Sequence, residues 1–240
     1  VMSPEGGGLT WALAPLIALQ RRAESSRTSL ARFELLTAER DSAAVAAQSL
    51  PILLDENRQL RALLDLAGRL PTRVISAEVL HQPVPTDGRT LLLSAGRRSG
   101  IVPFQAVVAP EGLLGVILTA GPTTSIALTW AHPDFRASAV TLDGSVTGIV
   151  GVTADASIRE PMLELRGVPY RDSVAAGTPV ITSGLGGVYP RGLPIGTVVG
   201  VARQSEGWER VYLVRPAAAP ARVSHALIVP AGTVWVGQGQ

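Results

Sequence analysis

The residues with the clearest potential for chemistry follow the order of a trypsin-like hydrolase. His81 comes first, Asp134 or Asp143 follows, and Ser183 comes last. In such a site the serine attacks, the histidine removes its proton and the aspartate orients the histidine. Ser183 also lies in a glycine-rich stretch whose amides could bind an oxyanion. It follows Thr182 instead of standing in a Gly-Asp-Ser-Gly-Gly context, so hydrolysis through Ser183 stays an alternative interpretation.

Metal, nucleotide and acid–base chemistry have weaker support. The three histidines are far apart, and the chain has no cysteine to supply thiolate ligands or disulfides. The glycine-rich run contains Pro190 and Pro194, so no helix N-terminus can follow it to hold a phosphate. Asp55 and Glu56 lie on an expected helix, where carboxylates are typical of a solvated face. We therefore expect no catalytic residue, no metal and no cofactor.

The distribution of charge argues against a nucleic-acid partner. All 21 basic residues are arginine, and with 19 acidic residues the formal net charge is only +2. A nucleic-acid-binding face would gather its arginines in one patch, whereas these are scattered. The close pairs are Arg21–Arg22, which could lie beside a membrane surface, and Arg97–Arg98. We expect no nucleic-acid partner.

Before the strands begin, the chain predicts a tether followed by a helix. Residues 1–20 contain a triple glycine and an apolar stretch too short to cross a bilayer, so we expect a membrane-proximal tether there. We expect any anchor to lie upstream of Val1. Residues 21–70 are rich in Ala, Arg, Glu, Leu and Gln, which are good helix formers. Pro51 should kink or restart this helix, and Gly68 should end it.

The helix carries a heptad-like seam with steps of three and four residues. Its members are Leu50, Leu53, Asn57, Leu60 and Leu64. Apolar residues at this spacing line one face of a helix and favour pairing with a second helix. Asn57 occupies an a-type position, where a buried asparagine can set register and two-strandedness. The alternative is that Asn57 caps a lone helix or faces solvent.

From residue 72 onward the pattern changes to short strands. Runs rich in Val, Ile, Leu and Thr alternate with turn signals such as Pro110-Glu111-Gly112 and Asp143-Gly144. The expected strands lie at 73–80, 90–95, 106–109, 113–119, 125–129, 137–142, 145–152, 162–166, 180–182, 195–202, 211–214 and 226–229. Short strands at this spacing predict barrels or sandwiches, not a parallel sheet.

Three stretches form a set that is specific in order and spacing. The first is the Glu-Asn-x-x-Leu-Arg-x-Leu-Leu pattern at 56–64, the second is GRRSGIVPFQAVVAPEGLLGVI at 96–117, and the third is VITSGLGGVYPRGLPIGTV at 180–198. The third is the most specific. Over nearly its whole length the chain resembles the MreC family of rod-shape-determining proteins. The family signature loop then consists of Thr182, Ser183, Gly184, Leu185, Gly186, Gly187, Pro190, Gly192, Pro194 and Gly196.

The resemblance implies a mainly β fold. An N-terminal coiled-coil helix over 21–70 would be followed by a first small β-barrel over 71–144. A second would cover 145–240 and include the C-terminal strand, with exchange of strands between the barrels as an option. The signature loop would be either a shaped partner surface or a loop that closes a barrel.

The resemblance also implies a function. The chain would be a non-catalytic scaffold of the cell-elongation machinery, organising peptidoglycan synthesis and cell shape. It would lie on the periplasmic (extracytoplasmic) face of the bacterial inner membrane, held by an anchor upstream of Val1. Its partners would be itself, as a homodimer or higher assembly, an MreD-like membrane protein and a class B penicillin-binding transpeptidase.

Two points depart from this family and one alternative stays open. The chain has Ala219-Pro220 where the family usually has an aspartate, and Gly177-Thr178 where Gly-Asp is usual. These differences concern loops. A periplasmic adaptor of another membrane complex would also join a coiled coil to β domains. Such adaptors usually have two antiparallel helices, whereas this chain has one helical stretch.

Overall fold

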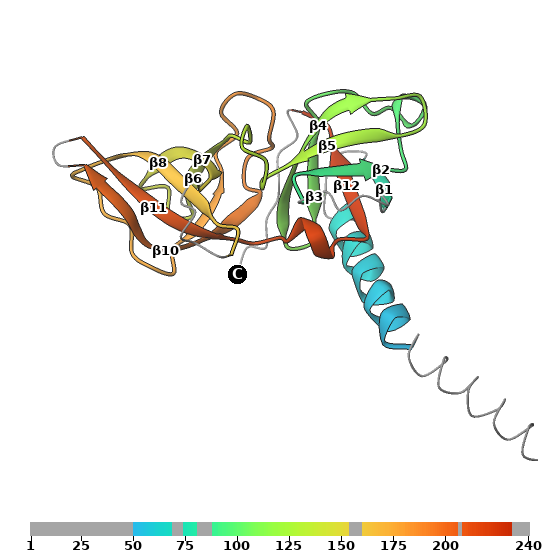
Figure 1. The fold of residues 1–240 in the computed structure, drawn as a ribbon, viewed down its shortest axis with the longest axis horizontal. Helices are drawn as coiled ribbons and strands as arrows, with labels where there is room; N and C mark the ends of the chain where they lie inside the picture. The colour runs from blue at the N-terminus through green and yellow to red at the C-terminus, as the bar shows by residue number, and fades with distance from the viewer. Residues whose placement is uncertain (1–49, 69–73, 81–87, 154–159, 206–207, 232–240) are drawn as a thin grey trace, which may run out of the picture. The chain divides into compact units, whose positions relative to one another are not determined.

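The computed structural model describes residues 50–68, 74–80, 88–153, 160–205 and 208–231 (Figure 1). The tether expected at 1–20, the helix expected at 21–49 and His81 lie outside these ranges. Residues 50–68 are helical, and the strands that follow form two barrels. No helical segment in the described part of the chain has the length and hydropathy that a membrane crossing requires. The expected mainly β fold with one helix and two barrels is confirmed.

The first barrel is a closed antiparallel sheet with the strand order β1-β12-β3-β4-β5-β2. Its strands are β1 (Ile75–Leu80), β2 (Thr90–Leu93), β3 (Ala106–Ala109), β4 (Gly112–Ala120), β5 (Ser125–Thr129) and β12 (His225–Val229). β12 pairs with β1 on one side and with β3 on the other. The last strand of the chain therefore completes the barrel that the first strand begins.

The second barrel is also closed, with the strand order β10-β11-β8-β7-β6-β9. Its strands are β6 (Ala137–Thr141), β7 (Thr147–Val152), β8 (Leu163–Pro169), β9 (Pro179–Thr182), β10 (Pro194–Ser205) and β11 (Glu209–Pro216). All twelve expected strands are present, and alternation of apolar residues together with the turn residues is what located them.

The expected boundary between the barrels, after residue 144, is wrong by one strand. β6 belongs to the second barrel, because it pairs with both β7 and β9. Asp143-Gly144 is therefore the hairpin turn between β6 and β7, and the connection between barrels lies at 130–136. The C-terminal strand, assigned by sequence to the second barrel, lies in the first. The resemblance had left an exchange of strands between the barrels open.

Two hydrophobic clusters form the core. One fills the first barrel and contains Leu93, Ile101, Val107, Leu114 and Ile228. The other continues from the second barrel to the outside of the first and includes Leu63 and Leu66 of the helix, Val108, Leu113, Leu165, Val180 and Leu227. β3 is buried along its whole length because its alternate residues enter different clusters. This explains why its sequence, AVVA, is continuously apolar.

Backbone contacts join the two barrels. The segment that leads from the second barrel to the first is held to β10, since Ala217 donates its N–H to the Ile195 carbonyl at 2.9 Å. A Cβ added to Gly112, the first residue of β4, would collide with the Pro194 carbonyl, so only glycine allows this approach. The start of β10 therefore lies against the start of β4.

Candidate functional site

The helix places its five expected seam residues on an exposed face. The leucines of the seam, Leu50, Leu53, Leu60 and Leu64, are 38–72% exposed, and Asn57 is also exposed. Leu63 and Leu66 point elsewhere and are buried against the barrels. Gln59 fixes the helix to the start of β12, since its Oε1 accepts a hydrogen bond from Ser224 Oγ at 2.8 Å. The helix therefore has one apolar face buried within the chain and a second apolar face in solvent.

Thr182 organises the signature loop between β9 and β10. Its buried hydroxyl donates to the Pro190 carbonyl and accepts from the Leu193 N–H at 2.8 Å. Its backbone N–H donates to the Leu193 carbonyl, and its carbonyl accepts from the Gly192 N–H, both at 2.9 Å. One residue thus ties both ends of the loop together.

The remaining signature residues shape the turn. Gly184 has φ +80°, and an added Cβ would lie 2.9 Å from Arg191 Cβ, so the position suits glycine alone. Gly186, Gly187 and Gly192 also have positive φ. A Cβ on Gly196 would collide with the Arg215 carbonyl of β11. Leu185 projects into solvent at the tip.

A buried aromatic pair supports the loop from inside. The rings of Tyr189 and Phe135 have centroids 5.9 Å apart at a tilt of 58°. Both side chains are buried, and burial raises the pKa of the Tyr189 hydroxyl. The loop is therefore anchored through its side chains as well as its backbone.

The residues of the hydrolase alternative have other roles where the structure describes them. The Ser183 N–H donates to the Ser138 carbonyl at 2.9 Å, and its Oγ accepts from the Leu185 N–H at 3.3 Å. Asp143 accepts from Ser145 Oγ at 2.9 Å across the β6–β7 turn. Hydrogen bonds from Thr141 and Ser145 lower the pKa of this carboxyl. These contacts stabilise turns.

His132 and Asp134 also stabilise the local backbone conformation. The Asp134 N–H donates to His132 Nδ1 at 3.1 Å in the connection between the barrels. Among the described residues, no group of three or more His, Cys, Asp or Glu side chains could hold a metal ion.

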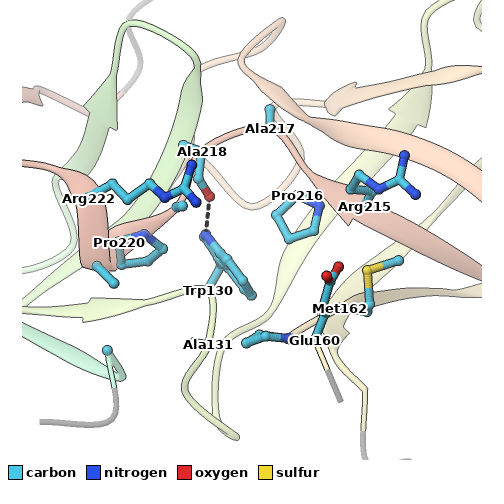
Figure 2. Close-up of a pocket in the computed structure, with 14 residues that line it drawn as sticks. Trp130, Ala131, Glu160, Met162, Arg215, Pro216, Ala217, Ala218, Pro220 and Arg222 are labelled. Atoms are coloured by element: carbon cyan, nitrogen blue, oxygen red, sulfur yellow. Dashed lines mark hydrogen bonds between the residues drawn. The ribbon is translucent and has the colours of Figure 1, made fainter. Parts of the chain in front are cut away.

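A pocket of about 410 Å³ lies beside this connection, and sequence reasoning did not find it (Figure 2). The buried indole of Trp130 donates its Nε1–H to the Ala218 carbonyl at 2.8 Å. Met162 and Pro216 add apolar surface, and Glu160, Arg215 and Arg222 add charge. The segment 215–222, which leads from β11 to β12, supplies most of the lining. No sequence signal joins Trp130 to a segment so far along the chain.

A buried carboxylate on β8 is the second feature that sequence reasoning missed. Glu164 is only 2% exposed. It accepts hydrogen bonds from Thr153 Oγ1 at 2.8 Å, from Arg166 Nε at 2.8 Å and from Arg203 at 3.2 Å. Burial alone would raise the pKa of Glu164, but the Thr153 hydroxyl and the two guanidinium groups outweigh it and lower that pKa. Glu164 therefore joins β8, β10 and the end of β7 as an anion.

Comparisons with known sequences agree on one family. The family model for rod shape-determining protein MreC, barrel core, matches residues 79–230. Cell shape-determining protein MreC of Listeria monocytogenes is 29% identical over 182 residues, which cover 74% of this chain and 60% of that protein. The chain thus spans about three fifths of the length of this relative.

Comparisons with solved structures agree with the sequences. A structure described as MreC has a TM-score of 0.66 and 26% identity, over 74% of this chain and 98% of that one. A complex between penicillin-binding protein PBP2 and MreC from Helicobacter pylori has a TM-score of 0.51 and 15% identity, over 65% of this chain and 98% of that one. At such identity the second likeness is one of fold.

Proposed function

The chain belongs to the MreC family of rod shape-determining proteins, and we propose that it is a non-catalytic scaffold that organises peptidoglycan synthesis during cell elongation. The observation that carries the proposal is the helix with two apolar faces. One face is buried by Leu63 and Leu66, while the leucines of the seam remain in solvent. A soluble monomer gains nothing from a second apolar face, but an assembly buries it.

Self-association through the seam is the first part of the proposal. Burying a leucine contributes on the order of 1.5–3 kcal/mol, so four leucines per helix can hold a dimer. Asn57 would set the register of the paired helices, because an unpaired amide in an apolar seam is costly. This pairing would join chains without covering either barrel.

Analytical ultracentrifugation of the 240-residue chain tests this part. Leu60→Glu with Leu64→Glu should lower the association constant at least about a hundredfold, since each change places a charge in the seam. Ile52→Glu is the matched control, because Ile52 is exposed on the same helix and outside the seam. Equal weakening by the control, or a monomeric parent chain, would contradict pairing through the seam.

Binding to wall-synthesis proteins is the second part of the proposal. The H. pylori complex shows PBP2 with an MreC protein, and this supports a class B penicillin-binding transpeptidase as the partner of our chain. An MreD-like membrane protein and a membrane anchor upstream of Val1 complete the proposed assembly, on the periplasmic face of the inner membrane. Within the signature loop, we assign Thr182 to barrel closure and the exposed Leu185 to partner contact.

Crosslinking with mass spectrometry on native membranes tests the partners. Crosslinks from the second barrel to a transpeptidase, and from the membrane-proximal part to an MreD-like protein, are the expected result. Leu185→Ser should remove crosslinks near the signature loop, whereas Val201→Ser, also exposed on the second barrel, should not. Crosslinks to an unrelated membrane complex would overturn the cell-wall function and leave the fold untouched.

A further inference from the structure

One end of the first barrel carries a group of exposed apolar and basic side chains. The loop between β2 and β3 contributes Arg97, Arg98, Val102 and Phe104, and β4 contributes Leu118. We call these five residues the apolar–arginine cluster. All five are exposed, and Phe104 is 66% exposed. Exposed large apolar groups and cations on one end of a domain are typical of a binding surface.

Two irregularities of the backbone occur at Phe104 and Leu118, two of the three apolar residues of the cluster. Phe104 has φ +69° and is the only non-glycine residue with positive φ in the described ranges. Leu118 is the extra residue of a β-bulge, because the pairing of β4 with β5 skips from Ile117 to Thr119. Backbone strain and bulges persist where they direct side chains for function. The positive φ of Phe104 and the bulge at Leu118 are close in space, since the Phe104 N–H donates to the carbonyl of Ile117 at 2.9 Å.

The loop that carries the cluster is held in place before any partner arrives. Buried Gln105 accepts a hydrogen bond from the Val102 N–H through its Oε1 at 3.1 Å. The N–H groups of Arg97 and Arg98 donate to carbonyls of the β4–β5 turn at 2.9 and 3.1 Å. Ile101 is fully buried between these points. A preformed surface loses little entropy on binding, which favours recognition.

The charge of this surface selects an anionic partner. Neither the loop at 96–105 nor the segment at 117–124 contains an aspartate or a glutamate. Glu78 of the neighbouring strand β1 is exposed beside Ser94, to whose Oγ its N–H donates at 2.9 Å, and this one carboxylate leaves the two arginines in excess. Guanidinium groups bind carboxylates through paired hydrogen bonds. The chemistry thus calls for a ligand that presents carboxylates next to apolar groups.

The position of the cluster on the first barrel narrows the choice of anionic ligand. It lies at the end of the barrel where β1 begins, because a Cβ on Gly100 would contact Ile75 at 3.7 Å. Gln59 of the helix bonds Ser224 at the other end, where the Ser224 carbonyl accepts from the Val79 N–H. Gln59 therefore contacts the end of the barrel away from the cluster.

We propose that the apolar–arginine cluster binds the cell wall itself, the glycan that carries short acidic peptides. Its free peptide carboxylates would pair with Arg97 and Arg98. Its sugar rings and its acetyl and alanine methyl groups would pack on Phe104, Val102 and Leu118. This inference rests on the proposed function and adds to it a direct contact between scaffold and wall. An anionic bilayer offers charge as well, but the cluster lies away from the end of the barrel that Gln59 contacts.

Cosedimentation of the 240-residue chain with purified peptidoglycan sacculi tests the proposal. The parent chain should pellet with sacculi, and Phe104→Gly should weaken binding about tenfold. Glycine suits the backbone at this position, so the variant should keep its fold, which circular dichroism checks. Trp208→Ala is the matched control, because Trp208 is 84% exposed on the second barrel. The control should bind like the parent.

The charge requirement has its own test. Arg97→Gln with Arg98→Gln should lose binding, whereas Arg171→Gln, which removes another exposed arginine, should not. Sacculi whose carboxylates have been amidated should no longer retain the parent chain. Retention that is unchanged by Phe104→Gly or by amidation would overturn the proposal.

Vesicles of phosphatidylglycerol and phosphatidylcholine supply the competing class of partner. Stronger pelleting with vesicles than with sacculi, lost in Phe104→Gly, would overturn wall binding in favour of a lipid surface. The proposed scaffold is tested separately by ultracentrifugation and membrane crosslinking. If those succeed while no sacculus binding occurs, the wall contact fails and the scaffold stands.

Discussion

The two barrels have the same number of strands but close in different ways. The second barrel is built from one continuous stretch, β6 to β11, and the hydroxyl of Thr182 ties the loop between β9 and β10. The first barrel needs β12, whose Ile228 pairs with Ile75 of β1. Contacts between residues so distant in sequence are costly to form. The stability of the first barrel should therefore depend on a remote strand, and that of the second on a local loop.

Removing core volume from the remote strand should have the largest effect. Ile228→Ala leaves a cavity in the first barrel and should lower the free energy of unfolding by about 3–4 kcal/mol. Urea denaturation measures this loss, and hydrogen exchange should rise first in β1 and β3. Val201→Ala is the control, since Val201 is exposed and should change stability by under about 0.5 kcal/mol. If exchange became faster in β9 and β10 instead, the first barrel would not depend on β12 more than the second barrel does.

Removing the hydroxyl from the local loop should have the next largest effect. Thr182→Val keeps the shape of the side chain but leaves the Pro190 carbonyl and the Leu193 N–H without their partner. The expected loss of unfolding free energy is about 2 kcal/mol. Thr197→Val on exposed β10 surface is the control. Hydrogen exchange should increase around β9 and β10 only, and protection lost in β12 would show that the two closures are coupled.

The buried carboxylate provides a pH-dependent difference between the barrels. Because the folded pKa of Glu164 lies below its ordinary value of 4.5, the anion stabilises the fold above about pH 4.5. That contribution is lost as the pH falls through the lowered folded pKa. Glu164→Gln should therefore cost about 1–2 kcal/mol at pH 7 and less at pH 3. Melting curves at both pH values measure this, with exposed Glu78→Gln as the control.

The smallest effect is expected at the strained residue of the first barrel. Phe104→Gly relieves a left-handed backbone at a non-glycine residue, which costs roughly 1–2 kcal/mol. Glycine offsets about 0.5–1 kcal/mol of that stabilisation, because the unfolded chain is more flexible with glycine and loses more entropy on folding. The free energy of unfolding should therefore stay within about 1 kcal/mol of the parent. A loss above about 2 kcal/mol would mean that Phe104 supports the fold and is not kept for binding.

The strands were predictable because their signals are local. Alternating apolar residues and turns such as Pro110-Glu111-Gly112 appear within a few residues of one another. The exposed seam of the helix follows from a simple spacing for the same reason. The periodicity of the strands predicted either barrels or sandwiches. The prediction of barrels came from the resemblance to a family.

The features that sequence reasoning missed depend on remote partners. β6 and β12 have ordinary strand patterns, and only their pairing decides which barrel they enter. Glu164 looks like a solvated residue of an alternating strand, yet Thr153 and Arg203 from other parts of the chain cover it. Trp130 likewise needs Ala218 to form the pocket wall. The order of residues along the chain does not show which of these distant residues come into contact.

The pairing of β1 with β12 also sets how the protein responds to tension. Ile75 begins β1 and pairs with Ile228 near the end of β12, so force entering from the helix and leaving through the C-terminus acts at the same end of one strand pair. A pull in this direction breaks the hydrogen bonds between the two strands one after another. A pull along the strands in opposite directions would instead load all of these hydrogen bonds at once. An optical-tweezers experiment with handles at the two ends should therefore show the first barrel yielding at low force while the second remains folded.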